Sequence, residues 1–361
     1  MIDLVPLHGG QMGQIAERFG IPVAELIDFS ANINPDGPPP AVLATLHAGL
    51  EDLSILTDYP DLEEAGLKQA VARYAGVRLQ NIAVANGFIP LLESALRTLK
   101  VKRCRLPVPA FVEYRRSLAR AGIEIEPFAL SPASNFRYDI DALMQGDPDA
   151  ILLANPQNPS GVLTDREILL QLVSKCAERK IAVLLDEAFI DYTPLESLVA
   201  DVECWSNLIV FRSVTKLHGV PGLRVAYAAA NQATARILQE NLPPWPITTL
   251  ASRAVAAALG DQAFEELTRR RNEDRGRTLK AGLEALGLHT YPAAANFLLL
   301  RLPEGASVVR FWNDMIVKHH IVVRDCSNYE ALPPGHVRVA IHKEQENAKL
   351  VRAMAQTLAS C

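Results

Sequence analysis

The sequence lacks the features that mark membrane proteins and nucleic-acid-binding proteins. No stretch of about 18 apolar residues occurs, and the first residues show no basic segment followed by an apolar one. The 36 Lys and Arg residues are outnumbered by 41 Asp and Glu residues, and the resulting net charge of −5 is unlike the basic surface that binds phosphate backbones or anionic lipids. We therefore expect a cytoplasmic protein with neither nucleic acid nor a membrane as a partner.

Cysteine is also scarce and unsuitably spaced for cross-linking or metal binding. The five cysteines form no C-x-x-C pair, and none has a histidine nearby at metal-ligand spacing. The sequence therefore predicts neither a disulfide framework nor a metal site. The five residues are Cys104, Cys176, Cys204, Cys326 and Cys361.

The chain does have enough apolar material, 49% of 361 residues, for a substantial core. From about residue 40 to residue 240, short apolar runs alternate with amphipathic segments, which is typical of a parallel sheet whose strands are connected by helices. The continuous apolar character of the runs suits strands that are covered on both faces. The clearest runs lie at residues 82–85, 150–154, 181–185, 208–211 and 224–228.

A cluster of prolines at residues 242–246 separates this region from a second one. Beyond it, the pattern predicts two long helices followed by two strands. They are expected over 249–259, 264–286, 296–302 and 337–341. We therefore predict an N-terminal arm (1–40), a large α/β domain (41–242) with a mostly parallel sheet flanked by helices, and a smaller α+β domain (243–361).

One loop between two predicted strands carries groups suited to a phosphorylated aldehyde cofactor. It reads Ser213-Val214-Thr215-Lys216 and continues to Arg224. The amine of Lys216 can form an imine with an aldehyde, while the two hydroxyls and the guanidinium can bind a phosphate dianion. Taken alone, the pattern also fits a surface lysine in a turn rich in glycine and proline.

Two further polar residues follow apolar strands at their carboxyl ends, where open α/β sheets bind ligands. Asp186 follows one strand directly, and an ionised carboxylate there can keep a pyridine nitrogen protonated, so that the ring accepts electrons. Asn158 lies in a turn with two prolines and can donate a hydrogen bond to a ring oxygen of the cofactor. A helix N-cap for Asp186 and a simple turn for Asn158 are the alternative roles.

The order and separation of these segments resemble the fold-type-I pyridoxal-phosphate enzymes of the aspartate aminotransferase superfamily. The matching motifs are an N-P-x-N-P-[ST]-G turn, a D-E-A-[FY] strand end and an S-x-[ST]-K loop that ends in G-x-R. The resemblance implies that Lys216 carries pyridoxal 5'-phosphate, that Asp186 acts with it in catalysis, and that the other motif residues bind the cofactor. Those residues are Asn158, Ser213, Thr215 and Arg224.

The same resemblance gives roles to positions outside the three motifs. Phe111 aligns with an aromatic residue that stacks on the pyridine ring. The turn Asn86-Gly87-Phe88 aligns with one whose backbone amides bind the cofactor phosphate. Tyr59 matches a tyrosine that reaches the phosphate in the neighbouring subunit, which implies a homodimer with shared active sites.

The sequence departs from the family pattern at a few positions. In the phosphate turn, Phe88, Ile89 and Pro90 follow the glycine, where relatives usually carry small or acidic polar residues, and Pro90 has no N–H to donate. His342 and Gln11 stand where relatives often carry arginine and asparagine, so the choice of substrate can differ.

Within the superfamily, the chain is similar from end to end to the threonine-phosphate decarboxylases of cobalamin synthesis, which are close relatives of histidinol-phosphate aminotransferases. Its distinguishing feature is the arm, in which His8-Gly9-Gly10 precedes a D-F-S-x-N-I-N-P sequence at residues 28–35. The similarity implies that the substrate is a small phosphorylated amino acid, whose carboxylate and phosphate need fixed donors. The candidate substrate-binding residues are His8, Asn32, Asn158, Arg324 and Arg338.

Three interpretations of the activity stay open at the level of sequence. The bond at Cα that stands perpendicular to the cofactor ring breaks most easily. If that is the bond to the carboxylate, carbon dioxide leaves and the protein is a decarboxylase of L-threonine O-3-phosphate. If it is the bond to hydrogen, a proton leaves and the protein is an aminotransferase such as histidinol-phosphate aminotransferase. A cofactor-binding protein without catalysis is the third. Threonine phosphate and serine phosphate are not separated, since one methyl group changes binding by only about 1–3 kcal/mol.

Overall fold

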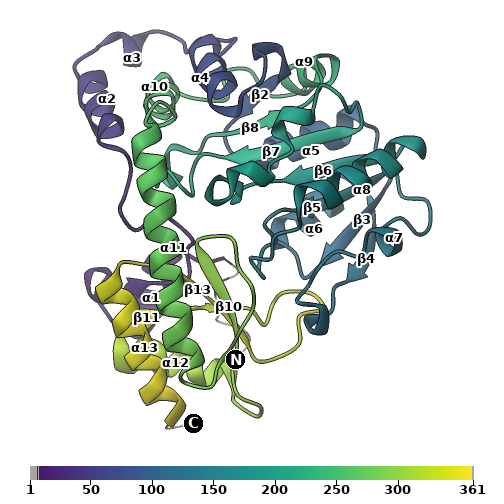
Figure 1. The fold of residues 1–361 in the computed structure, drawn as a ribbon. Coiled ribbons are helices and arrows are strands. Elements are labelled where there is room, and N and C mark those ends of the chain that lie inside the picture. The colour runs from purple at the N-terminus through teal and green to yellow at the C-terminus, as the bar shows by residue number, and fades with distance from the viewer. Residues whose placement is uncertain (1–5, 7, 360–361) are drawn as a thin grey trace.

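A seven-stranded sheet with helices on both faces forms the larger part of the molecule (Figure 1). The structure is a computed structural model and describes residue 6 and residues 8–359. Neighbouring strands from β4 to β7 are parallel, whereas β8 is antiparallel to both β7 and β2. In order across the sheet, the strands are β2 Ile82–Ala85, β8 Ala226–Ala229, β7 Leu208–Ser213, β6 Ala182–Asp186, β5 Ala150–Ala154, β3 Arg103–Val108 and β4 Glu124–Ala129. The predicted fold class, a mostly parallel sheet flanked by helices, is confirmed.

Alternate residues of the apolar strands point to opposite sides of this sheet, so both of its faces are apolar. Each face is covered by its own set of helices. On one face lie α4 Ala65–Ala75, α8 Arg166–Glu178 and α10 Thr249–Ala258. On the other face lie α5 Phe88–Thr98, α6 Val112–Arg120 and α9 Gln232–Glu240. Shorter helices in the connections are α3 Ser54–Thr57 and α7 Ile140–Leu143. With both faces buried, the ends of the strands are left to bind ligands.

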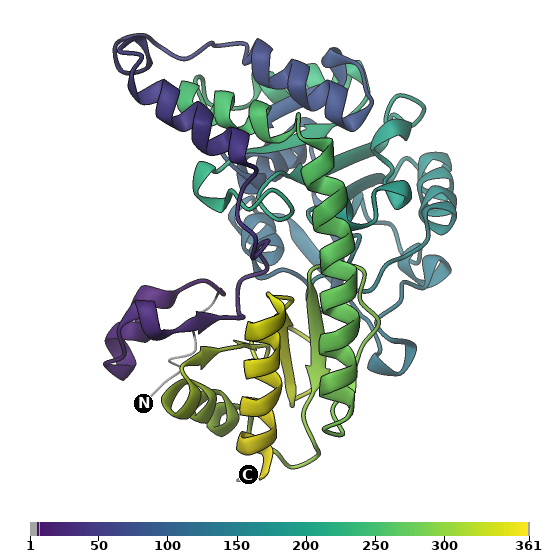
Figure 2. The ribbon, with the colours of Figure 1, turned by 60° about the vertical axis from the view of Figure 1, so that its left-hand side comes forward.

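A four-stranded antiparallel sheet forms the centre of a second, smaller unit. Its strands, in order, are β12 Arg324–Asp325, β13 His336–Ala340, β10 Phe297–Arg301 and β9 His289–Thr290. The helices around it are α11 Gln262–Glu284, α12 Val308–His319 and α13 Glu344–Ala359. The long helix α11 runs from the larger sheet down to the smaller one, as Figure 2 shows.

The N-terminal arm lies against the smaller unit (Figure 2). Its strand β1 (Ile27–Asp28) pairs in parallel with β11 (Ile321–Val322). Ile15 of helix α1 (Met12–Phe19) and Phe29 are buried in the same apolar core as α12 and α13. The segment from Met12 to Phe29 is therefore held by residues close to the end of the chain.

The helix α10 differs from the sequence-based expectation, which assigned it to the smaller domain. It packs against α2 (Pro40–Leu50) and α4, and its residues Ala254 and Val255 lie in the core of the larger sheet. The division of the chain at residues 40 and 242 stays a prediction, but the packing keeps α10 with the larger sheet.

Strand β8 also differs from the prediction. It begins at Ala226 instead of 224, because Arg224 adopts a left-handed backbone conformation with φ of +55°. A residue in that conformation cannot continue a strand. The turn at Arg224 directs the chain into β8.

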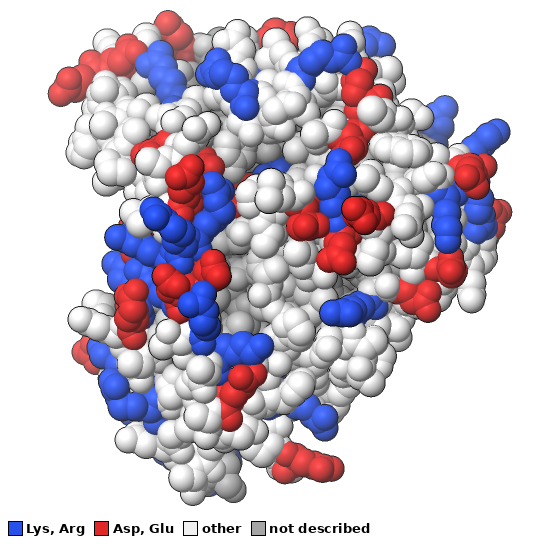
Figure 3. Space-filling view, in the orientation of Figure 1, with Lys and Arg blue, Asp and Glu red and all other residues white. Residues whose placement is uncertain are grey.

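Positive and negative side chains are interspersed on the face drawn in Figure 3. Along α11, for example, Arg277 pairs with Glu273 and Asp274. Within the described part of the chain, no helix combines the length and apolar character needed to cross a bilayer, and no cluster of His, Cys, Asp or Glu suits a metal ion. The described cysteines, which are Cys104, Cys176, Cys204 and Cys326, are not in disulfides; Cys361 lies outside the described residues.

Candidate active site

The central strands bring the predicted cofactor residues to one edge of the larger sheet. Ser213, at the end of β7, lies opposite Ala226 of β8, and Ala226 lies opposite Ala85 at the end of β2. Asp186, at the end of β6, lies opposite Ala154 at the end of β5. The loops next to these positions therefore converge at this edge, where open α/β sheets bind ligands.

Lys216 lies in a cavity of about 250 Å³ at this edge. Its Nζ atom is 5.6 Å from the centre of the Phe189 ring. Removal from water, assisted by the positive charge of Arg338, lowers the pKa of Lys216 to about 8, although the carboxylate of Asp186 opposes this change. An amine with this pKa is partly neutral near physiological pH, and the neutral form is the one that attacks an aldehyde.

Asp186 is buried, with 7% of its surface exposed. The hydroxyl of Tyr114 donates a hydrogen bond to its Oδ2, and the backbone N–H of Ala188 donates to its Oδ1 at 2.9 Å. Burial raises the pKa of Asp186 to about 6, while these two donors and Lys216 favour the ionised form. A cation placed against this carboxylate lowers its pKa again, so the site suits a protonated ring nitrogen.

A second set of polar groups lies where β7 and β8 meet the start of α5. Gly87 precedes α5 with φ of +90°, and a Cβ atom there would lie 2.8 Å from Nη2 of Arg224. The hydroxyls of Ser213 and Thr215 are 2.8 Å apart. The first N–H groups of a helix have no partner within it, although Pro90 removes one of them here. A guanidinium, two hydroxyls and a helix N-terminus are together suited to a phosphate dianion.

Phe88 explains how the unusual phosphate turn is accommodated. Its ring contacts Phe211 edge-on at 5.3 Å between centroids and lies 5.6 Å from the ring of Tyr114. The side chain thus packs against the core, and the backbone N–H of Phe88, the first residue of α5, stays at the N-terminus of that helix. Asn86, the residue before the glycine, is exposed.

Arg338, on β13, reaches from the smaller unit to the Asn158 turn. Its Nη1 donates to Asn158 Oδ1 at 2.6 Å, and its Nη2 donates to the carbonyl of Ser30 at 3.2 Å. The hydroxyl of Tyr329 also donates to Asn158 Oδ1, at 3.3 Å. Because Oδ1 already accepts these bonds, the Nδ2 amide of Asn158 is the group left to donate to a ligand.

The N-terminal arm supplies another wall of the cavity. Nε2 of His8 lies 3.0 Å from Oε1 of Glu113, and the His8 ring is 6.0 Å from the ring of Phe111. Asn32 is buried, and its Oδ1 has no hydrogen-bond partner among the described residues. The arm therefore presents a histidine and an asparagine to the same space as Lys216.

Arg324, on β12, is the second guanidinium in the cavity. Its Nη1 donates to the carbonyl of Pro6 at 2.8 Å, and its Nη2 donates to Asn328 Oδ1 at 2.7 Å. The guanidinium lies 5.5 Å from the centre of the Tyr329 ring. Two arginines from neighbouring strands thus line one small cavity with a lysine.

Seven of the fifteen site residues predicted from the sequence line the Lys216 cavity, whereas Asp186 and the predicted phosphate-binding residues do not; the latter are Asn86, Gly87, Phe88, Ser213, Thr215 and Arg224. Those that line the Lys216 cavity are His8, Asn32, Phe111, Asn158, Lys216, Arg324 and Arg338. Tyr59 does not, since it is 81% exposed and its ring packs on Trp245 at 4.8 Å. His342 is also outside the cavity, because its ring packs on Phe29 and its Nδ1 lies 3.0 Å from Glu346.

Three aromatic residues take places in the site that the sequence did not assign to them. Tyr114 donates to Asp186, Tyr329 donates to Asn158, and Phe189 lies against Lys216. Phe189 is the last residue of the D-E-A-[FY] motif, whereas Tyr114 and Tyr329 lie outside the motifs named above. Their contacts depend on elements that are distant in sequence, so the pattern around each residue does not reveal them.

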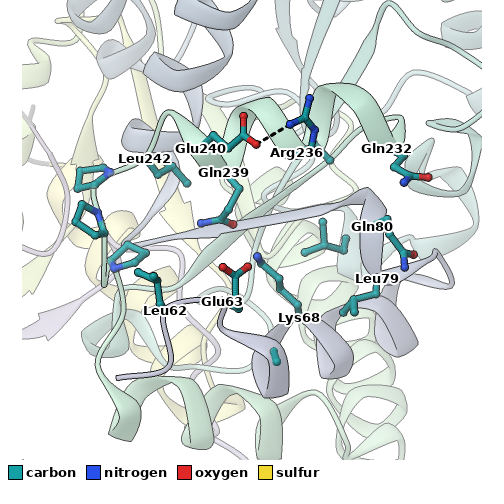
Figure 4. A pocket seen from close by; sticks show the side chains of 16 residues that line it. Leu62, Glu63, Lys68, Leu79, Gln80, Gln232, Arg236, Gln239, Glu240 and Leu242 are labelled. Atoms are coloured by element: carbon teal, nitrogen blue, oxygen red, sulfur yellow. Dashed lines mark hydrogen bonds and ion pairs between the residues drawn. The ribbon is translucent and has the colours of Figure 1, made fainter. Parts of the chain in front are cut away.

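A larger cavity, of about 720 Å³, lies elsewhere between α4 and α9 (Figure 4). Lys68 and Glu63 point into it from one side, and Gln239 and the ion pair of Arg236 with Glu240 lie on the other. None of the predicted site residues lines it. The smaller cavity is the candidate active site, because it combines an amine with a low pKa and two guanidiniums.

The residues of the smaller cavity and its surroundings fit pyridoxal 5'-phosphate. Lys216 offers an amine to the aldehyde, and the absence of a side chain at Gly87 allows Arg224 to approach a phosphate. Two buried polar atoms, Oδ1 of Asn32 and Nε of Arg338, have no protein partner among the described residues. Buried polar atoms of this kind require a polar partner, which a bound ligand supplies.

Comparison with known proteins finds relatives that match this chain over almost its whole length. Threonine-phosphate decarboxylase of Salmonella typhimurium is 34% identical over 359 residues, which cover 97% of this chain and 96% of that protein. Histidinol-phosphate aminotransferase 2 of Pseudomonas fluorescens is 28% identical, with 97% and 94% covered.

Solved structures of similar proteins have the same fold. That of histidinol-phosphate aminotransferase from Clostridium acetobutylicum matches with a TM-score of 0.86 and 27% identity, covering 93% of this chain and all of that one. That of L-threonine-O-3-phosphate decarboxylase from Porphyromonas gingivalis matches with a TM-score of 0.80 and 25% identity, covering 92% of this chain and 99% of that one. Residues 24–354 match the family described as aminotransferase class I and II, and the chain belongs to that family.

Proposed function

We propose that the protein is a pyridoxal 5'-phosphate-dependent lyase that converts L-threonine O-3-phosphate to (R)-1-amino-2-propanol O-2-phosphate and carbon dioxide, for cobalamin synthesis. The observation that carries the proposal is the pair of guanidiniums, Arg324 and Arg338, in one cavity with Lys216. Two fixed cations match a substrate that carries both a phosphate and a carboxylate. The 34% identity to a threonine-phosphate decarboxylase supports the same substrate.

Pyridoxal 5'-phosphate is the cofactor of this enzyme, and when bound it supplies an electron-accepting ring that allows a bond at the substrate Cα to break. We assign Lys216 to its aldehyde, Asp186 to its ring nitrogen, and the Nδ2 amide of Asn158 to its ring oxygen. Phe111 is assigned to the ring face. The phosphate is assigned to the turn at Asn86, Gly87 and Phe88 together with Ser213, Thr215 and Arg224.

The substrate is held by residues from both ends of the chain. In this proposal, Arg338 binds the carboxylate, while Arg324, His8 and Asn32 bind the phosphate. Holding two anionic groups would fix the rotation about Cα, and with it which bond of Cα is presented to the cofactor for cleavage. Lys216, with a pKa lowered to about 8, can deliver a proton from Nζ to the carbon that has lost carbon dioxide.

An aminotransferase acting on histidinol phosphate is the second candidate. It is favoured by the 28% identity to histidinol-phosphate aminotransferases over 97% of the chain. The same residues serve this reaction if the bond to hydrogen stands perpendicular and Nζ of Lys216 accepts the proton. The two reactions differ in their need for a 2-oxo acid.

The deciding experiment is product analysis with purified protein, cofactor and L-threonine O-3-phosphate, with and without 2-oxoglutarate. We expect carbon dioxide and aminopropanol phosphate in both mixtures, identified by mass spectrometry. Glutamate that forms only when 2-oxoglutarate is present would establish the aminotransferase, and histidinol phosphate would then be the next substrate. No reaction with either substrate would revive a cofactor-binding protein without catalysis.

We also propose a homodimer in which Tyr59 binds the cofactor phosphate of the partner subunit. Tyr59 lies outside its own cavity, and the neighbouring Leu53 and Leu56 are 69% and 83% exposed. Large apolar side chains exposed in one region favour an interface. A cytoplasmic location remains a prediction from the sequence.

Mixing two variants that each lack one residue of the site tests whether the site is shared. Lys216→Ala and Tyr59→Ala subunits are unfolded together, refolded and assayed, because a mixed dimer has one site with both residues intact. We expect activity well above the sum of the two variants assayed separately. Activity equal to that sum, or a monomer by sedimentation at assay concentration, would contradict the shared site.

A further inference from the structure

Tyr329 lies in the cavity but is not among the residues assigned to the cofactor or the substrate. It follows β12 and is 8% exposed, with its ring in an apolar cluster that includes Phe136 and Tyr291. Its hydroxyl leaves this cluster and reaches the cavity, where it donates to Asn158 Oδ1 at 3.3 Å and accepts from Nη1 of Arg338 at 3.4 Å. One rigid side chain therefore contacts both the cofactor-side amide and a substrate-side guanidinium.

The ring of Tyr329 makes a separate contact with the other guanidinium. Arg324 lies 5.5 Å from the ring centre, within the range of a cation–π interaction. The hydroxyl and the ring face thus act on different arginines. The two contacts are separable by substitution, since phenylalanine keeps the ring and removes only the hydroxyl.

We propose that Tyr329 is a positioning residue that sets the orientation of both arginines, through its hydroxyl for Arg338 and through its ring for Arg324. The inference rests on the proposed function, in which Arg338 binds the carboxylate and Arg324 the phosphate. Arginine side chains have many rotamers, so a guanidinium needs fixed neighbours if it is to hold an anion in one orientation. Tyr329 provides such a neighbour for each of them.

The contact of the Tyr329 hydroxyl with Arg338 affects which bond breaks more than the contact of the ring with Arg324 does, because Arg338 holds the carboxylate. Nη1 of Arg338 donates hydrogen bonds to both Asn158 Oδ1 and the Tyr329 hydroxyl, and the hydroxyl itself donates to Asn158 Oδ1. Without the hydroxyl, Arg338 keeps its contacts with Asn158 and with Ser30, but the guanidinium can turn about the remaining bonds. A carboxylate bound to it would then no longer be held in one orientation, while the phosphate is still held.

The test compares Tyr329→Phe and Tyr329→Leu in the cofactor-loaded enzyme, with threonine phosphate as substrate and aminopropanol phosphate, which lacks the carboxylate, as inhibitor. We expect Tyr329→Phe to lower kcat/KM about tenfold, the size of a lost hydrogen bond to a charged group, and to leave the inhibition constant of the amine unchanged. Tyr329→Leu is expected to weaken binding of both compounds, because the ring contact with Arg324 is lost as well.

The matched control is Tyr291→Phe. Tyr291 lies in the same apolar cluster, is also buried, and its hydroxyl is 2.9 Å from Nε2 of His336 instead of reaching the cavity. It is expected to lose stability to a similar extent as Tyr329→Phe but to keep its kinetic constants. Equal kinetic losses in the two phenylalanine variants, or a Tyr329→Phe enzyme that loses affinity for substrate and amine alike, would overturn the proposal.

Failure of the proposed function is distinguishable from failure of this inference. The wild-type enzyme could release no carbon dioxide and transaminate histidinol phosphate instead. In that case Arg338 binds the carboxylate of 2-oxoglutarate, and Arg324 binds the phosphate of histidinol phosphate. Tyr329→Phe is then expected to weaken the apparent affinity for the oxo acid and to leave the affinity for histidinol phosphate unchanged. Unchanged affinities for both compounds would overturn the role of Tyr329 in that reaction too.

Discussion

The Lys216→Ala enzyme is expected to lose covalent attachment of pyridoxal 5'-phosphate and to lose turnover by at least about 10³-fold, since the same amine attaches the cofactor and transfers the proton. The fold is expected to be retained, because removing this partly desolvated amine also removes its cost of burial. Attachment is measured by borohydride reduction followed by peptide mass mapping, which labels the Lys216 peptide in the wild-type enzyme.

Lys68→Ala is the matched control for this experiment. Lys68 is also a partly desolvated lysine with a pKa lowered by burial, and it lines the other cavity shown in Figure 4. Its variant is expected to keep both the label and the activity. A label that persists after Lys216→Ala, or wild-type turnover in that variant, would remove Lys216 from the mechanism.

The Asp186→Asn enzyme is expected to bind the cofactor and to turn over more slowly by a factor on the order of 10²–10³, the usual cost of losing one preorganised electrostatic contact in an active site. An asparagine has nearly the same shape; its Oδ1 can still accept from the N–H of Ala188, while its Nδ2 faces the Tyr114 hydroxyl and can donate to it. It carries no charge, however, and cannot hold a ring nitrogen in its protonated form. The measurement is kcat together with the absorbance spectrum of the bound cofactor.

Tyr114→Phe distinguishes the effect of the charge on Asp186 from the effect of the hydrogen bond that Tyr114 donates to it. It removes one donor to the carboxylate and raises the pKa of Asp186 further, because the hydrogen bond from Tyr114 opposes the effect of burial. We expect a loss of about tenfold, clearly less than for Asp186→Asn. Equal losses of turnover in Tyr114→Phe and Asp186→Asn, or wild-type turnover in Asp186→Asn, would show that the reaction does not need the negative charge of Asp186.

The buried strands were predictable because continuous apolar runs have few other uses in an α/β chain. Strands β5, β6 and β7 lie within one or two residues of the predicted runs. Strands β3 and β4 were not predicted. β3 contains two arginines and a proline, and β4, at the edge of the sheet, has only exposed and half-buried residues. Neither resembles a covered strand in sequence.

The site was predictable as a set of residues but not as a set of contacts. Lys216, Asn158 and Arg338 were identified from motifs, yet the bond from Arg338 to Asn158 joins residues from separate units of the fold. Tyr329 lies 171 positions after Asn158 in the sequence. Pairings of this kind follow from the packing of the two units, and no local pattern encodes them.

The pairing of β1 with β11 has a consequence for the order in which the protein acquires its parts during synthesis. The strands and loops assigned to the cofactor lie between residues 82 and 229, so they are complete when nearly two thirds of the chain has left the ribosome. The arm with His8 and Asn32 is made first, but its β1 strand must wait for residues 321–322 before it has a partner. Because domains generally fold as they emerge, the cofactor-binding half is expected to fold early, and the substrate-binding half last. A nascent chain arrested before β11 would therefore bind the cofactor and be unable to recognise the substrate.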